Sequence, residues 1–97
     1  MNPLTVEAAE RTIREILQSG HVLVSRHAKE MMRERGYTLG DVLFILEHGA
    51  VTKREEGQNR QYRYHVHGDD LEGHKGIVIV AIIRRDKLAI VTVLGGV

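Results

Sequence analysis

The chain has 97 residues with no cysteine, 42% hydrophobic and 28% charged residues, and a formal net charge of +1. This length allows one domain with one modest core, and the lack of cysteine excludes disulfides and thiolate chemistry. Residues 1–49 carry six Lys/Arg against seven Asp/Glu, and residues 50–97 carry eight against six. Any nucleic-acid contact must therefore come from a local cluster of cations. We find no signal-peptide pattern and no apolar run near the ~20 residues of a membrane helix, so we expect a cytoplasmic protein that does not bind membranes.

The first predicted helix begins after Asn2-Pro3-Leu4-Thr5, where Asn or Thr can cap it and Pro suits the first turn. Gly20 ends it. Its apolar residues recur at helical spacing; they are Val6, Ala9, Ile13, Ile16 and Leu17. The short segment His21–Val24 that follows is either an extended connector or a small edge strand.

The second predicted helix is fully bounded, because Ser25 can cap its start and Gly36 can adopt the left-handed conformation at its end. Arg35 falls on the same side as the apolar stripe. Either its stem packs while its head reaches water, or it reaches a site where the helix meets the rest of the fold. His27 lies in the first turn, where the helix N-terminus disfavours imidazolium and favours bound anions.

The third predicted helix begins at Thr38, which forms a capping-box pattern with Asp41, and ends at Gly49. Beyond it the apolar period becomes that of strands. We predict strands at 50–53, 60–66, 77–83 and 88–94, with loops at 55–59 and 67–76 and a hairpin connection at 84–87. The sequence therefore predicts one α+β domain, residues 1–97, with three N-terminal helices packed on one face of a C-terminal antiparallel sheet of about four strands.

The last two predicted strands are apolar on both faces, since Ile77 and Ile79 alternate with Val78 and Val80. Helices on one side leave the second face to be covered by the curl of the sheet and the tyrosines, by a second chain or by a ligand. A homodimer or a partner protein is thus one hypothesis for the function.

No phosphate loop, nucleophile elbow or zinc-protease helix is present. His65 and His67 share a predicted strand face, and such pairs can bind zinc, but no third ligand is clear. We expect neither a metal nor a cofactor. The remaining polar candidates are His27, Arg35, Lys53, Arg60, Tyr62, Arg63, Tyr64, His65 and Thr92.

Arg60, Tyr62 and Tyr64 share one face of their predicted strand. Arginine binds phosphate in bidentate geometry, and tyrosine can stack on a base. Alternatively, both tyrosines are half-buried core residues and Arg60 is a solvated edge residue.

From about Val22 to Val93 the chain resembles a small bacterial domain family of largely uncharacterised function, DUF4258-like, which is grouped with the RelE-like and MqsR-like toxins. The resemblance is carried by Ser25-x-His27-Ala28-x-x-x-Met32-x-x-Arg35-Gly36, Asp41-Val42, Gly49, Arg60-x-Tyr62 and Ile90-Val91-Thr92-Val93. The grouping implies a fold of the barnase–EndoU–colicin–RelE type. It also implies a metal-independent endoribonuclease that cleaves RNA by attack of the ribose 2′-OH on the adjacent phosphate and that an antitoxin protein neutralises.

The resemblance implies five catalytic residues by matching position. His27 would be the acid or base, Arg35 and Arg60 would hold the phosphate, Tyr62 would orient or stack, and Thr92 would donate a hydrogen bond. These roles require His27 to lie close to Arg60 and Tyr62. The predicted substrate-binding residues are Lys53, Arg63, Tyr64 and His65.

Three hypotheses for the function follow from the sequence. The first is this toxin-type endoribonuclease, with RNA and an antitoxin as partners. The second is a non-catalytic interaction module or homodimer that uses the apolar sheet face. The third is non-catalytic RNA binding, which the balanced charge makes the weakest.

Overall fold

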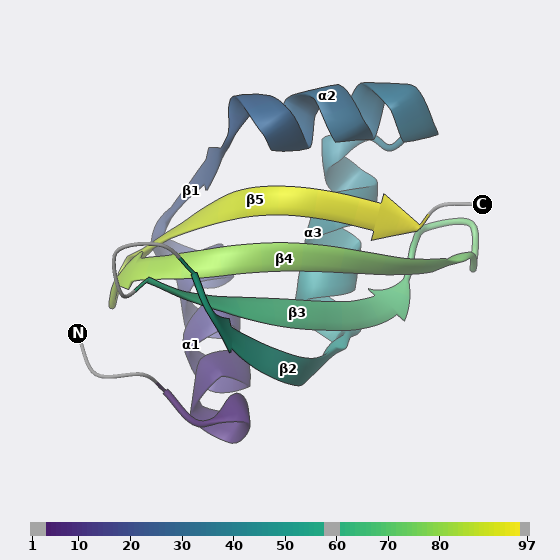
Figure 1. Ribbon diagram of the computed structural model, residues 1–97. Helices are drawn as coiled ribbons and strands as arrows, with labels where there is room; N and C mark the ends of the chain where they lie inside the picture. The colour runs from purple at the N-terminus through teal and green to yellow at the C-terminus, as the bar shows by residue number, and fades with distance from the viewer. Residues whose placement is uncertain (1–3, 58–60, 96–97) are drawn as a thin grey trace.

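The computed structural model describes residues 4–57 and 61–95, which form three helices and five strands in one layered domain (Figure 1). In chain order these are α1 (Val6–Ser19), β1 (His21–Val24), α2 (Arg26–Arg35), α3 (Leu39–His48), β2 (Ala50–Glu56), β3 (Tyr62–Asp69), β4 (Lys75–Arg84) and β5 (Lys87–Gly95).

The strands form one mixed sheet in the order β1-β5-β4-β3-β2, in which β1 pairs parallel to β5 and the other neighbours pair antiparallel. The α+β class holds, but the prediction of an antiparallel sheet of about four strands is wrong. The prediction that the helices all precede the strands is also wrong, since β1 lies between α1 and α2. The four residues of β1 pair with residues 87–90, and no local pattern in a short segment indicates so distant a parallel partner.

The helices occupy two places on the sheet. α1 and α3 cover one face, whereas α2 runs along β5 (Figure 1). β1 pairs only with residues 87–90 of β5, so the rest of that strand has a free edge, which we call the β5 edge. The Ser25 backbone N–H donates to the Ile90 carbonyl at 3.0 Å, and the Ser25 hydroxyl donates to Val91 O at 3.1 Å. α2 thus covers the part of β5 beyond the end of β1, and it adds the fully buried Ala28 to the core. α1 and α3 cover the rest of that face.

The helix ends follow the predicted capping residues. The side chains of Thr5, Ser25 and Thr38 each accept a backbone N–H of the first turn, and Asp41 completes the capping box with Thr38. Gly36 ends α2 with φ 71°, a left-handed conformation that glycine adopts without steric cost.

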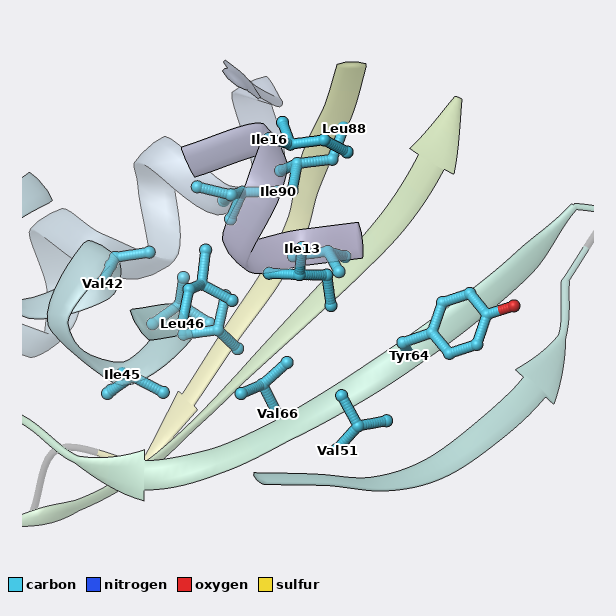
Figure 2. Packing of buried hydrophobic residues seen from close by; sticks show 14 of the residues in the cluster. Ile13, Ile16, Val42, Ile45, Leu46, Val51, Tyr64, Val66, Leu88 and Ile90 are labelled. Carbon is cyan, nitrogen blue, oxygen red and sulfur yellow. The ribbon is translucent and has the colours of Figure 1, made fainter. Parts of the chain in front are cut away.

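The core lies between α1, α3 and the sheet face that they cover, which we call the inner face (Figure 2). Strand residues that point into this core and are at most 2% exposed include Tyr64, Val66, Val78, Val80, Leu88, Ile90 and Val93. The residues that alternate with them lie on the outer face. Ile79 and Ala81 are only 7% exposed although neither belongs to the core cluster, so neighbouring side chains of the sheet itself cover part of the outer face.

Candidate functional site

The outer face of the sheet is the surface on which predicted functional residues gather, and no described helix covers it (Figure 1). The strand register arranges its side chains in rows. One row consists of Lys53, His65, Ile79 and Thr92, and the next consists of Glu55, Arg63, Ala81, Ala89 and Leu23. The β2–β3 half of this face is therefore charged, and the β4–β5–β1 half is mainly apolar.

A carboxylate–imidazole pair lies at the centre of the charged half. His65 Nε2 is 2.9 Å from Glu55 Oε1, and Lys53 Nζ is 3.8 Å from Glu55 Oε2. The side chain of His65 is 14% exposed and that of Glu55 is 39% exposed. Arg63 is the direct cross-strand neighbour of Glu55. We call Lys53, Glu55, Arg63 and His65 the outer-face cluster.

The electrostatics of this cluster keep Glu55 ionised. The hydrogen bond from His65 lowers the pKa of Glu55 against the opposing effect of burial. The charge of His65 when it is protonated, and the charges of Lys53 and Arg63, lower it further. Because an ionised carboxylate only accepts hydrogen bonds, His65 Nε2 must carry the donated proton. The Nδ1 atom of His65 is then the ring nitrogen that can take a proton.

Glu55 is the residue of this cluster that the sequence analysis missed. The sequence predicts a loop at 55–59, but β2 continues to Glu56. One pattern in the sequence does indicate a longer strand. Lys53 and Glu55 alternate in the same way as Arg63 and His65, so pairing the two segments places Glu55 opposite a residue of the other charge.

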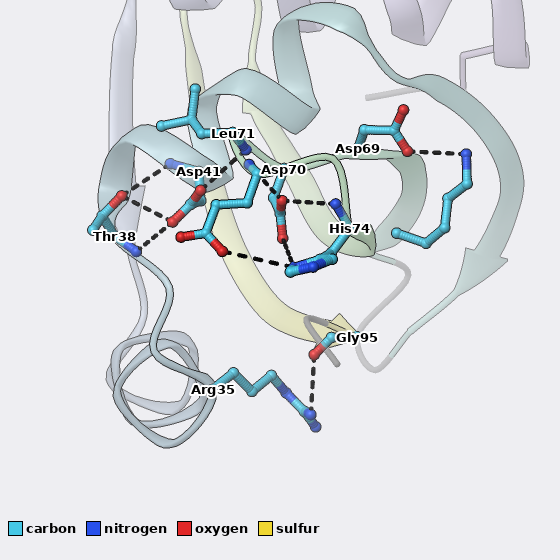
Figure 3. Close-up of polar contacts among 10 residues, drawn as sticks. Arg35, Thr38, Asp41, Asp69, Asp70, Leu71, His74 and Gly95 are labelled. Carbon is cyan, nitrogen blue, oxygen red and sulfur yellow. Dashed lines mark hydrogen bonds and ion pairs between the residues drawn. The ribbon is translucent and has the colours of Figure 1, made fainter.

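His27 and Arg35, two of the predicted catalytic residues, lie on α2 beside the β5 edge. His27 is exposed in the first turn. The Arg35 guanidinium is hydrogen-bonded to the β5 backbone. Its Nε donates to Val93 O at 3.2 Å, and its Nη1 donates to Gly95 O at 3.2 Å, the second bond being drawn in Figure 3. Arg35 therefore satisfies carbonyls of β5 beyond the residues that pair with β1.

The tyrosines of β3 lie on the inner face. Tyr64 is 2% exposed, and its hydroxyl accepts the Leu4 N–H at 2.9 Å and donates to Leu4 O at 3.3 Å. Tyr62 packs against the core cluster, and the Arg54 guanidinium carbon lies 5.7 Å from the centre of its ring. Tyr62 therefore fits the alternative of a half-buried residue at the core, whereas Tyr64 is more deeply buried than that alternative predicts.

The structure does not bring the predicted catalytic set together. β4 separates β3 from β5, and Tyr62 lies on the inner face while His27 lies on the helix along the β5 edge. Arg60 falls outside the described residues. Thr92 shares a row with His65 and Lys53, with two strand spacings, or about 10 Å, between the backbones of Thr92 and His65.

A second polar cluster surrounds the β3–β4 turn and holds the turn on the start of α3 (Figure 3). Asp70 is 4% exposed and accepts the N–H groups of Glu72 and His74, each at 2.9 Å. Burial acts to raise the pKa of Asp70, but these backbone hydrogen bonds hold it below its usual range. Asp41 also accepts the Leu71 N–H at 3.1 Å. These contacts give the cluster a structural role.

Tyr37 lies beside this turn. Burial, and then the neighbouring Asp70 carboxylate, raise the pKa of Tyr37 to about 12. Its buried hydroxyl has no hydrogen-bond partner of good geometry within residues 4–57 and 61–95, and a Cβ atom on Gly76 would lie 2.5 Å from it. Gly76 is therefore required for tight packing at this end of the inner face.

Comparison with known families identifies residues 24–94 as a domain of unknown function, DUF4258. This match covers most of the chain, which therefore belongs to that family. No curated protein and no solved structure matches the chain.

Two further features of the described residues concern metal binding and membrane-spanning helices. Within 4–57 and 61–95 there is no group of three His, Asp or Glu side chains arranged to hold a metal ion. Among the helices formed by the same residues, none has the length and hydrophobicity needed to cross a bilayer.

Proposed function

We propose that the chain is a toxin-type, metal-independent endoribonuclease of the RelE-like and MqsR-like group whose working surface is the outer face of the sheet. The observation that supports this most is the 2.9 Å contact between His65 and Glu55, with Lys53 and Arg63 beside it. Of the four predicted substrate-binding residues, the proposal retains Lys53, Arg63 and His65. It assigns the acid–base chemistry to His65 together with Glu55.

The proposed reaction needs a base for the 2′-hydroxyl and cations around the phosphate. His65 Nδ1 takes the proton, and Glu55 holds the tautomer and stabilises the imidazolium that forms. Lys53 and Arg63 bind the non-bridging phosphate oxygens. Thr92, two strands away from His65 in the same row, donates a hydrogen bond to another part of the RNA. With RNA as substrate, the activity belongs in the cytoplasm, and an antitoxin is the expected partner protein.

The test is cleavage of a mixed-sequence RNA by the purified chain in the presence of EDTA. We expect products that end in a 2′,3′-cyclic phosphate, and a rate about 100-fold or more lower for Glu55→Gln, by the usual size of acid–base contributions. Glu56→Gln is the matched control, because Glu56 is the next residue along β2 and faces the other way, opposite Tyr62. Absence of cleavage by the wild type, or equal rates for the two variants, contradicts the proposal.

A homodimer through the outer face is the second candidate, and it is favoured by an exposed apolar residue of that face. Leu23 is 47% exposed and pairs with Ala89 in the outer row. The same face carries both signs of charge, so it is complementary to a copy of itself. Light scattering would show a dimer that Leu23→Asp dissociates. A monomer at high concentration excludes this candidate.

A further inference from the structure

Two histidines follow each other on the outer face of β3. His65 and His67 pair with Ile79 and Ile77 of β4, respectively, while Val66 between them is 1% exposed in the core. Residues two apart on a strand lie about 7 Å apart and point to the same side. The structure therefore places a second imidazole beside the proposed site, along the same strand.

The surroundings of the two imidazoles differ. His65 is bound to Glu55 and largely covered. His67 is exposed, and among residues 4–57 and 61–95 its imidazole forms neither a hydrogen bond nor an ion pair. His48 and His74, by contrast, each lie within 4 Å of a carboxylate. Within the described chain, His67 is therefore available to an external ligand.

Transphosphorylation requires two proton transfers, and the outer-face cluster supplies only the first. When the 2′-oxygen attacks, the bond from phosphorus to the 5′-oxygen breaks, and this alkoxide leaves readily only if it receives a proton. Two imidazoles about 7 Å apart on one face can each come within about 3 Å of one of the two oxygens that flank a phosphate held between them.

We propose that His67 is the general acid of the reaction, an inference that rests on the proposed function. His65 removes the 2′-hydroxyl proton as the 2′-oxygen–phosphorus bond forms. The imidazolium of His67 gives its proton to the 5′-oxygen as the phosphorus–oxygen bond breaks. The products are a 2′,3′-cyclic phosphate and a 5′-hydroxyl, and exchange with water restores both histidines.

The test compares two RNAs that differ in one atom. The first is an oligonucleotide with a mapped cleavage site, and the second carries sulfur in place of the bridging 5′-oxygen at that site. A thiolate leaves without a proton, so the second RNA does not need a general acid. We expect His67→Ala to cut the normal RNA about 100-fold more slowly or worse, yet to cut the sulfur-containing RNA within about fivefold of the wild-type rate.

Two control variants separate the possible failures. His65→Ala should lose activity on both RNAs, because both need the base. His74→Ala should keep both activities, since His74 lies on the β3–β4 turn beside Asp70 and Glu72. If His67→Ala slows both RNAs equally or neither, His67 is not the acid, although the proposed function stands. If the wild type cuts neither RNA, the proposed function fails and this inference fails with it.

Discussion

The two faces of the sheet are formed by the same strands but differ in burial and in the side chains that they carry. Inner-face residues such as Val78, Val80 and Leu88 are completely buried under α1 and α3. The outer face holds a charged cluster beside an apolar half, and no described helix covers it. The comparison teaches that residue type alone does not assign function in this chain. Tyr64 belongs to the core and Tyr62 packs against it, whereas Glu55, in a segment predicted as a loop, lies in the candidate site.

The largest expected difference between the two faces is the loss of stability when a side chain is truncated to alanine. Leu88→Ala removes a fully buried side chain and should lower the free energy of unfolding by about 2–5 kcal/mol. Leu23→Ala, on the outer face at 47% exposure, should change it by no more than about 0.5 kcal/mol. Urea denaturation measures both. Similar losses for the two variants would mean that a partner or a second copy buries the outer face.

The tight packing of the inner face predicts the next effect. Gly76→Ala places a Cβ atom 2.5 Å from the Tyr37 hydroxyl and 2.9 Å from Ile45 Cδ1, and should destabilise the fold by about 1–3 kcal/mol. Adding Tyr37→Phe should recover part of this loss, because it removes the closest atom. A double-mutant cycle by thermal melting checks the coupling. Additive losses would show that the hydroxyl is not the obstacle.

The hydrogen bonds between α2 and β5 predict a smaller effect on stability. Arg35→Ala removes two hydrogen bonds to β5 carbonyls and should cost about 1–2 kcal/mol. Arg33→Ala is the control, since Arg33 is exposed on the same helix. Equal stability of the two variants would mean that Arg35 does not hold α2 to the sheet.

The smallest effect concerns the pH dependence of stability. The pKa of Glu55 is lower in the folded chain than in the unfolded one, so its contribution is present above the unfolded value, near pH 4.5, and is lost as the pH falls through the folded value. Glu55→Gln should therefore make the acid side of the stability curve slightly shallower, and Glu56→Gln should not. Solvent screening keeps this effect small.

Local signals in the sequence predicted most of the elements. Ser25, Thr38 and Gly36 cap the helices as expected because capping chemistry depends on neighbouring residues alone. The alternation in β3 correctly placed Tyr62 and Tyr64 on one side and Arg63 and His65 on the other. The sequence pattern did not reveal which of these sides the helices cover.

What could not be predicted depends on distant pairing. β1 joins the sheet through a parallel partner more than 60 residues away, and Glu55 meets His65 only because the β2–β3 register brings them together. The expected meeting of His27 with Arg60 and Tyr62 came from a family resemblance. The strand order places β4 between Tyr62 on β3 and the strand along which α2 lies.

The most direct test of the outer face as the working surface compares His65→Ala with His27→Ala in RNA cleavage with EDTA present. His65 is bound to Glu55 on the outer face, whereas His27 is exposed on α2 at the β5 edge. The account predicts a loss of about 100-fold or more for His65→Ala and a rate close to wild type for His27→Ala. The reverse result, with His27→Ala inactive and His65→Ala active, would contradict it and place the chemistry at the start of α2.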